Sequence, residues 1–400
     1  MTPRPAAVVG VGMSEFRTRR DDEDLRGLIQ EGAHAALADA GLEPSDVDAF
    51  VLAEAPDALH GIGHPEQLAA GALAIAGRPA LRVNTGGATG ASAAQLGWWA
   101  VASGRFDTVL VVGAEKMGDS TRGAQETLNK IWDPAYESLL PLNTIAMTAL
   151  QVVRYMERHG STEEQFAAIA SRLRASGARN RYAHLREPVS TAEVMASPLL
   201  CWPVRRGMAC PRSSGACAIV ITSEERARRM SAPKAWIRSF AARSNTYFMG
   251  DKMGDAGLND HGFMYDLKLA AEEAYAIAGI EDPAKEIDVA EPYVPFAPVE
   301  PGAVEALGLC APGEGARLAV EGAWDADGGR VAVCPSGGVM CANPISVSAL
   351  VRVAEAAQQV RGRADDHQVD GVRTAVAGGA GGSYQFFVVG VLSTEPERRP

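Results

Sequence analysis

The segment ALADAGLEP at residues 36–44 recurs as AYAIAGIEDP at residues 274–283. Each copy closes a run of small apolar residues typical of a helix, and each stops that run at a glycine, Gly41 or Gly279. The two glycines are 238 positions apart, and the apolar segments that follow them are 240 apart. So constant a spacing predicts a chain built from two similar halves.

Strands and helices alternate in the same order in both halves. The predicted strands are 8–11, 47–52, 81–84 and 108–113, then 234–240, 287–290, 330–334, 372–376 and 384–392. The predicted helices are 25–40 and 91–103, then 267–278 and one starting near residue 346. Gly-rich breaks follow strands at 85–90, 335–338 and 378–382. This alternation predicts an α/β fold with mostly parallel strands, helices on both faces and a pseudo-two-fold axis.

The stretch of about residues 120–206 interrupts the repeat with few strand patterns. Two amphipathic helices are expected at 144–158 and 162–174, and Thr162 with Gln165 makes a capping box. We therefore expect an inserted, mainly helical loop domain that covers a substrate site. The expected boundaries are 1–119 plus 207–232 for the first half, 120–206 for the insert and 233–400 for the second half.

Composition excludes several classes of protein. Of 400 residues, 47% are hydrophobic and 22% charged, which is enough apolar material for two cores. The net charge of −11, with scattered basic residues, argues against nucleic acid as a ligand. No apolar run reaches the ~18 residues of a membrane span, and the first residues lack a signal segment. Six cysteines without a C-x-x-C pair predict reduced thiols, a cytoplasmic protein and no metal site.

Four strings carry a resemblance to a known family: VNTGGATGA (83–91), VVGAEKM (111–117), SSGACA (213–218) and SGGVMCANP (336–344). Together with the repeat they resemble the thiolase superfamily, in the branch related to sterol carrier protein x thiolases. The resemblance covers nearly the whole chain. It implies the thiolase fold, in which the two halves form a five-layered αβαβα core.

The sequence departs from the thiolase pattern at every acyl-transfer position. Gly87 matches the position of the nucleophilic cysteine, which a helix N-terminus activates in that family. Tyr293 and Asn343 match the positions of two family histidines. The last Gly-rich loop, 375–382, lacks the family's second cysteine. These departures imply that no acyl-cysteine forms and that thiolysis and Claisen condensation are excluded.

The altered site resembles the thiolase-like aldolases of steroid side-chain degradation. The resemblance implies retro-aldol cleavage of a 17-hydroxy steroid with a short acyl-CoA side chain to a 17-ketosteroid and propionyl-CoA. Such a lyase needs a base and donors to the enolate oxygen, but no nucleophile. Tyr293 is the expected base or relay if its pKa is lowered from ~10. Tyr247 is the next candidate base. Asn343 is the expected donor to the thioester oxygen.

Other expected site features concern binding. Gly87 in place of cysteine is expected to open room for a ring system. The predicted substrate-binding residues are Gly86, Gly87, Gly338, Gly381 and Tyr384. Coenzyme A is expected only as part of the substrate, with its phosphates near arginines of the insert. These are Arg172, Arg174, Arg179, Arg181, Arg205 and Arg206.

Alternatives stay open at this point. The chain is also compatible with another thiolase-like acyl-CoA acyltransferase subunit, or with an inactive structural subunit. Tyr293 is compatible with simple packing, Tyr384 with a core strand position, and Asn343 with an N-cap of the following helix. We expect a homodimer that pairs along the strand at 81–84. The resemblance also implies a separate small partner protein with an OB-fold and a zinc ribbon.

Overall fold

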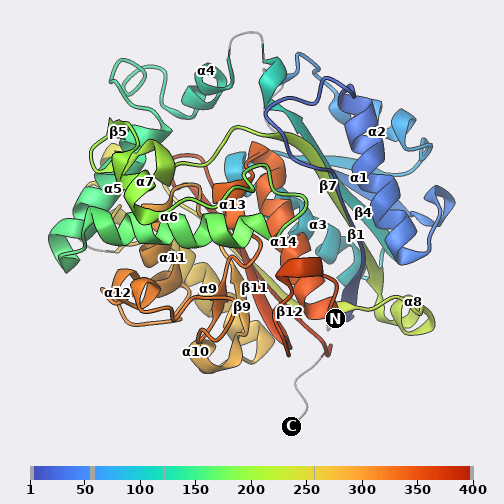
Figure 1. Ribbon diagram of the computed structural model, residues 1–400. Coiled ribbons are helices and arrows are strands. Elements are labelled where there is room, and N and C mark those ends of the chain that lie inside the picture. The colour runs from blue at the N-terminus through green and yellow to red at the C-terminus, as the bar shows by residue number, and fades with distance from the viewer. Residues whose placement is uncertain (1–3, 55–58, 121–122, 256, 397–400) are drawn as a thin grey trace.

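The computed structural model in Figure 1 describes residues 4–54, 59–120, 123–255 and 257–396. Its centre is one ten-stranded sheet in the order β10-β9-β11-β12-β8-β1-β7-β4-β2-β3. The first-half strands are β1 (Ala6–Met13), β2 (Ala49–Ala53), β3 (Ala80–Val83), β4 (Thr108–Lys116) and β7 (Ser214–Ser223). The second-half strands are β8 (Ala235–Ser244), β9 (Val289–Glu291), β10 (Ala332–Val333), β11 (Thr374–Gly381) and β12 (Phe386–Ser393).

Each half contributes five strands, which are mixed in direction and not uniformly parallel. Strand β2 runs parallel to β3 and β4, whereas β7 runs antiparallel to β4 and β1. Likewise β9 is parallel to β10 and β11, whereas β12 is antiparallel to β11 and β8. The short turn between β11 and β12 leaves no room for a crossover helix, so only an antiparallel pairing is possible there.

The two half-sheets are joined at β1 and β8, a contact that the sequence did not predict. Ala6 pairs with Ile237, Ala7 with Trp236 and Val8 with Ala235, all antiparallel. The two paired strands are the first strand of each half and lie in the middle of the strand order.

The expected five layers are confirmed by which side chains of a strand pack together. Val109 and Val111 of β4 belong to the core around α3 (Thr89–Ala102) and α14 (Ile345–Arg361), which lie between the two half-sheets. Leu110 and Val112 of the same strand pack against α1 (Leu25–Ala40) on the outer face. The outer layer of the second half contains α9 (Tyr265–Ala278) and α11 (Glu300–Ala306). Alternate residues of each strand thus serve different layers.

The helix ends follow the sequence patterns closely. Helix α1 is capped by the Asp24 side chain, which accepts from the Gly27 N–H, and it ends at Gly41 with φ 68°. Helix α9 ends at Gly279 with φ 70°. A left-handed residue at this place lets the chain leave the helix while its last carbonyls stay bonded, and glycine adopts it without strain.

Between β4 and β7 the chain forms a mainly helical excursion. Its elements are α4 (Ala124–Leu128), α5 (Thr144–His159), α6 (Glu163–Ala178), α7 (Thr191–Ala196), β5 (Leu199–Cys201) and β6 (Val204–Arg205). The Thr162–Gln165 capping box is present at the start of α6. In Figure 1 the green helix α6 crosses in front of α13 (Gly338–Cys341). The small β5–β6 ribbon was not expected from the sequence.

The remaining helices are short and lie outside the central layers. They are α2 (Pro65–Ala72), α8 (Glu224–Arg229), α10 (Pro283–Glu286) and α12 (Gly315–Val320). None of the helices among the described residues is long and apolar enough to cross a membrane.

Candidate active site

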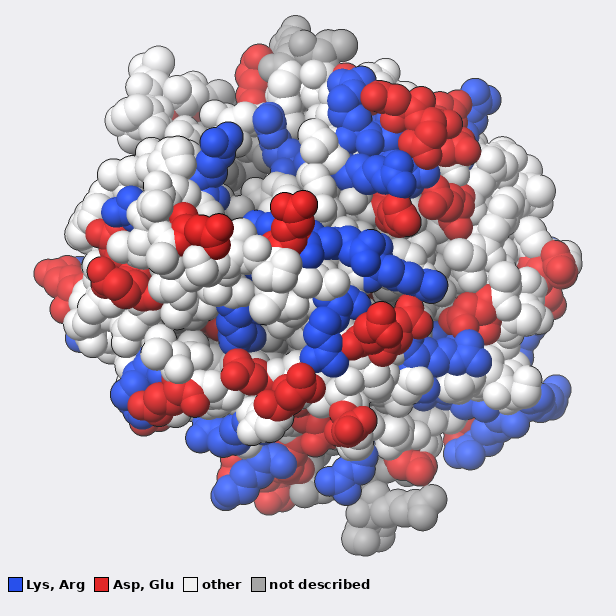
Figure 2. Space-filling model, viewed as in Figure 1, with Lys and Arg blue, Asp and Glu red and all other residues white. Residues whose placement is uncertain are grey.

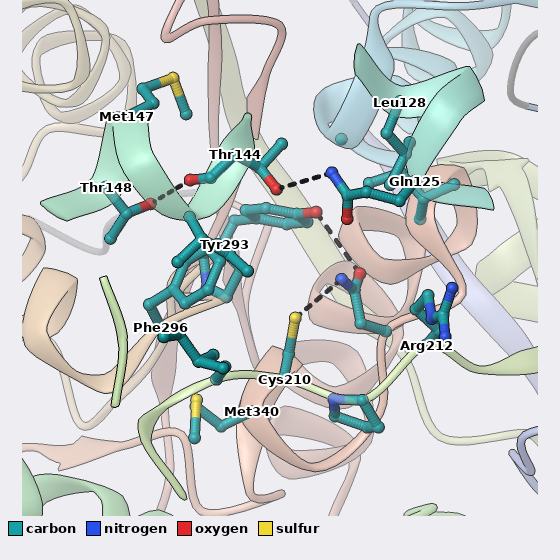
Figure 3. A pocket seen from close by; sticks show the side chains of 18 of the residues that line it. Gln125, Leu128, Thr144, Met147, Thr148, Cys210, Arg212, Tyr293, Phe296 and Met340 are labelled. Carbon is teal, nitrogen blue, oxygen red and sulfur yellow. Dashed lines mark hydrogen bonds between the residues drawn. The ribbon is translucent and has the colours of Figure 1, made fainter. Parts of the chain in front are cut away.

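A cavity of about 910 Å³ opens where the insert covers the Gly-rich turns of both halves. Its floor is formed by Gly86, Gly87, Tyr293, Asn343 and Gly381, which the fold brings together from four separate segments. Figure 3 shows the Tyr293 ring and the Cys210 thiol facing the cavity, with Phe296 and Met340 beside them and Gln125 and Thr144 opposite. The insert supplies most of the apolar wall: Leu128, Ile131, Ile145, Met147, Leu185, Val189, Val194 and Leu200.

Gly87 and Tyr293 form a mutually dependent pair. A Cβ atom at Gly87 would lie 2.7 Å from the Tyr293 hydroxyl oxygen and 2.4 Å from the Ala380 carbonyl oxygen. Both separations are shorter than real Cβ contacts, so no side chain fits at residue 87 beside Tyr293. The expectation that Gly87 opens room for a ring system is therefore wrong, because the tyrosine fills that space.

The turn after β11 holds the opposite wall of the site. The Gly-rich segment predicted as a break continues the strand through Gly381, which pairs with Phe386 of β12. The turn comes one residue later, at Gly382 and Tyr384, with φ 64° and 57°. A Cβ at Gly381 would lie 2.0 Å from the Thr85 carbonyl oxygen, so glycine is needed for close approach of the two halves.

Asn343 links Tyr293 to Cys210, a residue that the sequence did not single out. The Tyr293 hydroxyl donates to the Asn343 Oδ1 at 3.5 Å, and the Ser348 hydroxyl donates to the same oxygen at 2.7 Å. The Asn343 Nδ2 donates to the Cys210 Sγ at 3.0 Å. Asn343 does not cap α14, because Pro344 occupies the N-cap position. Its carboxamide is instead oriented by the side chains of Tyr293, Ser348 and Cys210.

Backbone hydrogen bonds hold the segment around Cys210 to the Tyr293 loop and to Asn343. Its N–H donates to the Pro295 carbonyl at 3.0 Å, two residues beyond Tyr293, and Ala209 forms a bridge with Phe296. Further along, the Ser213 N–H donates to the Asn343 carbonyl at 3.2 Å. The segment 209–213 is thereby held to the Tyr293 loop on one side and to Asn343 on the other.

A buried ion pair between Glu291 and Arg352 lies at the start of the Tyr293 loop. Glu291 ends β9, and its carboxylate pairs with the Arg352 guanidinium of α14. The Ser336 N–H and hydroxyl donate to the same carboxylate at 3.2 and 3.0 Å. Both charged side chains are almost fully buried, so removing either would leave an uncompensated charge in the interior.

Electrostatics at the site differ from what the sequence implied. Burial raises the pKa of Tyr293 well above its usual range, and the nearby Cys210 and Tyr384 add to this effect. Burial also raises the pKa of Tyr384, next to the Thr148 hydroxyl. The lowering that a tyrosine base requires is not provided, so Tyr293 keeps its proton and acts as a donor. Burial raises the pKa of the Cys210 thiol to about 11, although the Asn343 N–H partly offsets it.

Two predicted site residues do not line the cavity. Gly338 is buried in a tight turn, where a Cβ would lie 2.9 Å from the Cys334 Sγ. Tyr247 is 43% exposed, and it contributes to the neighbourhood only through its carbonyl, which accepts from Ser383 and Gln385. Gly86, Gly87, Gly381, Tyr293, Asn343 and Tyr384 all line the cavity. Tyr384 lies in a turn and not in the strand predicted for it.

Most of the arginines proposed for coenzyme A are engaged elsewhere. Arg172 pairs with buried Glu300, and Arg179, Arg181 and Arg205 pair with Asp327, Asp365 and Glu163. Arg174 and Arg206 line the cavity, and the sequence missed two further basic residues there, Lys130 and Arg212. Figure 2 shows Lys and Arg side chains on both sides of the hollow between α4 and α6. With Glu193 as its one carboxylate among the described lining residues, the cavity has more basic than acidic side chains, although the net charge of the chain is −11.

Comparison with known families matches both halves of the chain. Residues 6–184 match the thiolase N-terminal domain, and residues 259–394 match the thiolase C-terminal domain-like family. The first match also includes residues 120–184 of the stretch expected to be an insert.

Relatives of similar identity carry different activities. The chain is 29% identical to an acetyl-CoA acetyltransferase of Methanothermobacter thermautotrophicus, over 95% of this chain and 98% of the relative. It is also 29% identical to a steroid side-chain-cleaving aldolase of Thermomonospora curvata, over 95% and 96%. Human sterol carrier protein 2 is 29% identical, over 94% of this chain and 69% of the relative.

Solved structures agree on the fold. The Ltp2-ChsH2(DUF35) aldolase superposes with a TM-score of 0.82 at 27% identity, over 98% of both chains. Human mitochondrial 3-ketoacyl-CoA thiolase superposes with a TM-score of 0.71 at 16% identity, over 98% and 99%. With two matched domains, five layers and full-length relatives, the chain belongs to the thiolase superfamily, and within it is similar to sterol carrier protein 2 and to the thiolase-like aldolases.

Proposed function

We propose that this protein is an acyl-CoA lyase that cleaves a β-hydroxyacyl-CoA side chain of a steroid by a retro-aldol reaction. The observation that carries the proposal is the packing at Gly87. In a thiolase-type acyl transfer a side-chain nucleophile must stand at this turn, and here the Tyr293 hydroxyl and the Ala380 carbonyl exclude one. A retro-aldol reaction needs no covalent intermediate, so it is compatible with this site.

Sequence identity does not separate the two candidate activities, because an acetyltransferase and an aldolase are both 29% identical to the chain. The site favours the lyase. Tyr293, which keeps its proton, and the Asn343 carboxamide are hydrogen-bond donors at the cavity floor. Donors of this kind stabilise the thioester enolate that forms as the carbon–carbon bond breaks.

The shape of the cavity fits a substrate with one apolar and one charged end. The wall is apolar, and the volume of about 910 Å³ lies in the range of large ligand pockets. The rim carries Lys130, Arg206 and Arg212, which would attract the phosphates of a coenzyme A moiety. A steroid ring system against the wall would leave its thioester side chain to reach Tyr293 and Asn343.

The direct test is a cleavage assay. The purified chain, with and without a candidate small OB-fold, zinc-ribbon protein, is incubated with a 17-hydroxy steroid carrying a short acyl-CoA side chain. We expect a 17-ketosteroid and propionyl-CoA, and no acylated cysteine in the intact-protein mass spectrum. Thiolysis of a 3-ketoacyl-CoA, or an acyl-cysteine, would instead support the acyltransferase alternative. No reaction under any condition would support an inactive structural subunit.

We also propose two kinds of partner and a cytoplasmic location. The similarity to the Ltp2-ChsH2(DUF35) aldolase supports a heteromeric complex with a small protein. Six free thiols are typical of a reducing compartment. A homodimer is supported by β3, which lies at one end of the sheet and pairs only with β2 among the described strands.

The homodimer is tested by light scattering. Leu81 of β3 is 56% exposed, so a second copy that pairs along this edge would cover it. We expect a particle of twice the 42.0 kDa chain mass at micromolar concentration, and dissociation when Leu81→Lys places a charge on that edge. A stable monomer of the unaltered protein would contradict the proposal.

A further inference from the structure

We propose that Cys210 is the catalytic base of this site, and that it takes the proton from the β-hydroxyl group of the substrate. This inference rests on the proposed lyase function. Cys210 lines the cavity, and its sulfur lies 3.0 Å from the Asn343 Nδ2. Figure 3 shows the thiol next to the Tyr293 ring, on the side of the cavity where Phe296 and Met340 lie.

Several groups at the cavity can exchange a proton, and most are unsuited to this role. Lys130, Arg174, Arg206 and Arg212 are basic side chains suited to the phosphates of coenzyme A. Glu193 of α7 is the only carboxylate among the described lining residues, and its Oε2 accepts from the Ser190 N–H and hydroxyl, both at 2.7 Å. Those bonds lower the pKa of Glu193, which weakens it as a base.

The remaining candidates are Tyr293, Tyr384 and Cys210. Burial raises the pKa of all three groups, that of the Cys210 thiol to about 11. The Tyr293 hydroxyl donates to the Asn343 Oδ1, a contact that favours its protonated form, whereas the Cys210 sulfur accepts from the Asn343 Nδ2. The Asn343 N–H that points at the sulfur stabilises the thiolate, and no carboxylate is found next to it among the described lining residues. Cys210 is therefore the neutral group at the cavity floor that loses its proton most readily.

In this mechanism Cys210 acts first as the base and then as the acid. With a pKa of about 11, only a small fraction of Cys210 is thiolate at neutral pH, and this fraction is the reactive form. The thiolate takes the hydroxyl proton, and the oxygen electrons form the ketone double bond. The bond between the α and β carbons then breaks, and its electron pair enters the thioester enolate, whose oxygen accepts from Tyr293 and Asn343. The new S–H returns its proton to the enolate α carbon, which yields the short acyl-CoA and restores the thiolate.

A serine and an alanine variant separate this role from a merely structural one. Cys210→Ala removes both the base and the acceptor of the Asn343 N–H. Cys210→Ser keeps a hydrogen-bond acceptor for Asn343 but has a far higher pKa. We expect both to lower kcat by roughly 10²–10⁴-fold, with unchanged binding of propionyl-CoA by calorimetry. Cys201→Ala, in β5 outside the cavity, is the matched control and is expected to stay fully active.

The pH profile is a second readout. Below the pKa of about 11 the thiolate fraction grows about tenfold per pH unit, so kcat of the unaltered protein should rise steeply between pH 7 and 10. The profile of Cys210→Ala should be flat. Full activity of Cys210→Ser, which would mean that residue 210 only orients Asn343, overturns the proposal, as does an unchanged profile in Cys210→Ala. If the unaltered protein cleaves no β-hydroxyacyl-CoA, the lyase function falls with it, whereas an active unaltered protein with active variants overturns the base alone.

Discussion

Tyr293→Phe is expected to lower kcat by roughly 10²–10³-fold, the usual cost of removing one donor from a developing oxyanion. The hydroxyl is the only part of the side chain that is lost, and its hydrogen bond to Asn343 is long, at 3.5 Å. Unfolding free energy should therefore fall by no more than about 1 kcal/mol. A turnover assay and a denaturant titration measure the two effects separately.

Tyr275→Phe supplies the matched control. Tyr275 is also a buried tyrosine, and its hydroxyl donates to the Leu307 carbonyl at 2.9 Å in the outer layer, away from the cavity. We expect it to lose stability but to keep its turnover. The pH profile of Tyr293→Phe should keep the steep rise of the unaltered protein, because the proton acceptor is untouched. A Tyr293→Phe protein with near-normal kcat would show that the tyrosine only packs.

Gly87→Ala is expected to damage both activity and stability. The added Cβ would lie 2.4 Å from the Ala380 carbonyl and 2.7 Å from the Tyr293 hydroxyl, so the ring and the turn after β11 must move apart. Overpacking of this kind costs about 1–3 kcal/mol, and a displacement near 1 Å at the reacting groups costs about 10²-fold in rate. Chemical denaturation and the lyase assay measure these losses.

The double variant Gly87→Ala, Tyr293→Ala tests the cause. Removing the ring relieves one of the two close contacts, so part of the lost stability should return, and the two changes should not be additive. Gly71→Ala is the control glycine, because a Cβ there meets nothing within 4 Å, and its stability should not fall. Additive losses in the double variant would contradict direct contact between residues 87 and 293.

The layers of the fold could be predicted because they depend on local patterns that the chain repeats. Gly41 and Gly279 both end helices as left-handed caps, and the apolar strand at β4 is covered on both faces. The β1–β8 junction could not be predicted in this way, since pairing between distant strands depends on tertiary geometry. The turn at Gly382 was misplaced because glycines usually break strands, whereas Gly379 and Gly381 serve close packing inside one.

The site was only partly predictable for a related reason. Family positions led to Tyr293 and Asn343. In the structure the Tyr293 hydroxyl lies 3.5 Å from the Asn343 Oδ1 at the cavity floor. Cys210 follows from no such position. Its Cys-Pro pair, one residue before the SSGACA string, was the available sequence pattern. Only the backbone bonds to Pro295 and Asn343 show that this segment crosses the cavity. Tyr247 is not among the described residues that line the cavity, and its place in the sequence could not show which way its loop faces.

The position of β1 between β7 and β8 has a consequence for synthesis on the ribosome. Its first residue, Ala6, pairs with Ser223 on one side and Ile237 on the other. A ribosome adding 5–20 residues per second leaves this apolar strand without either neighbour for roughly ten to forty seconds. During that time α1, which is made directly after β1, can cover one face of the strand. Slower translation through the insert would lengthen that exposure and favour aggregation.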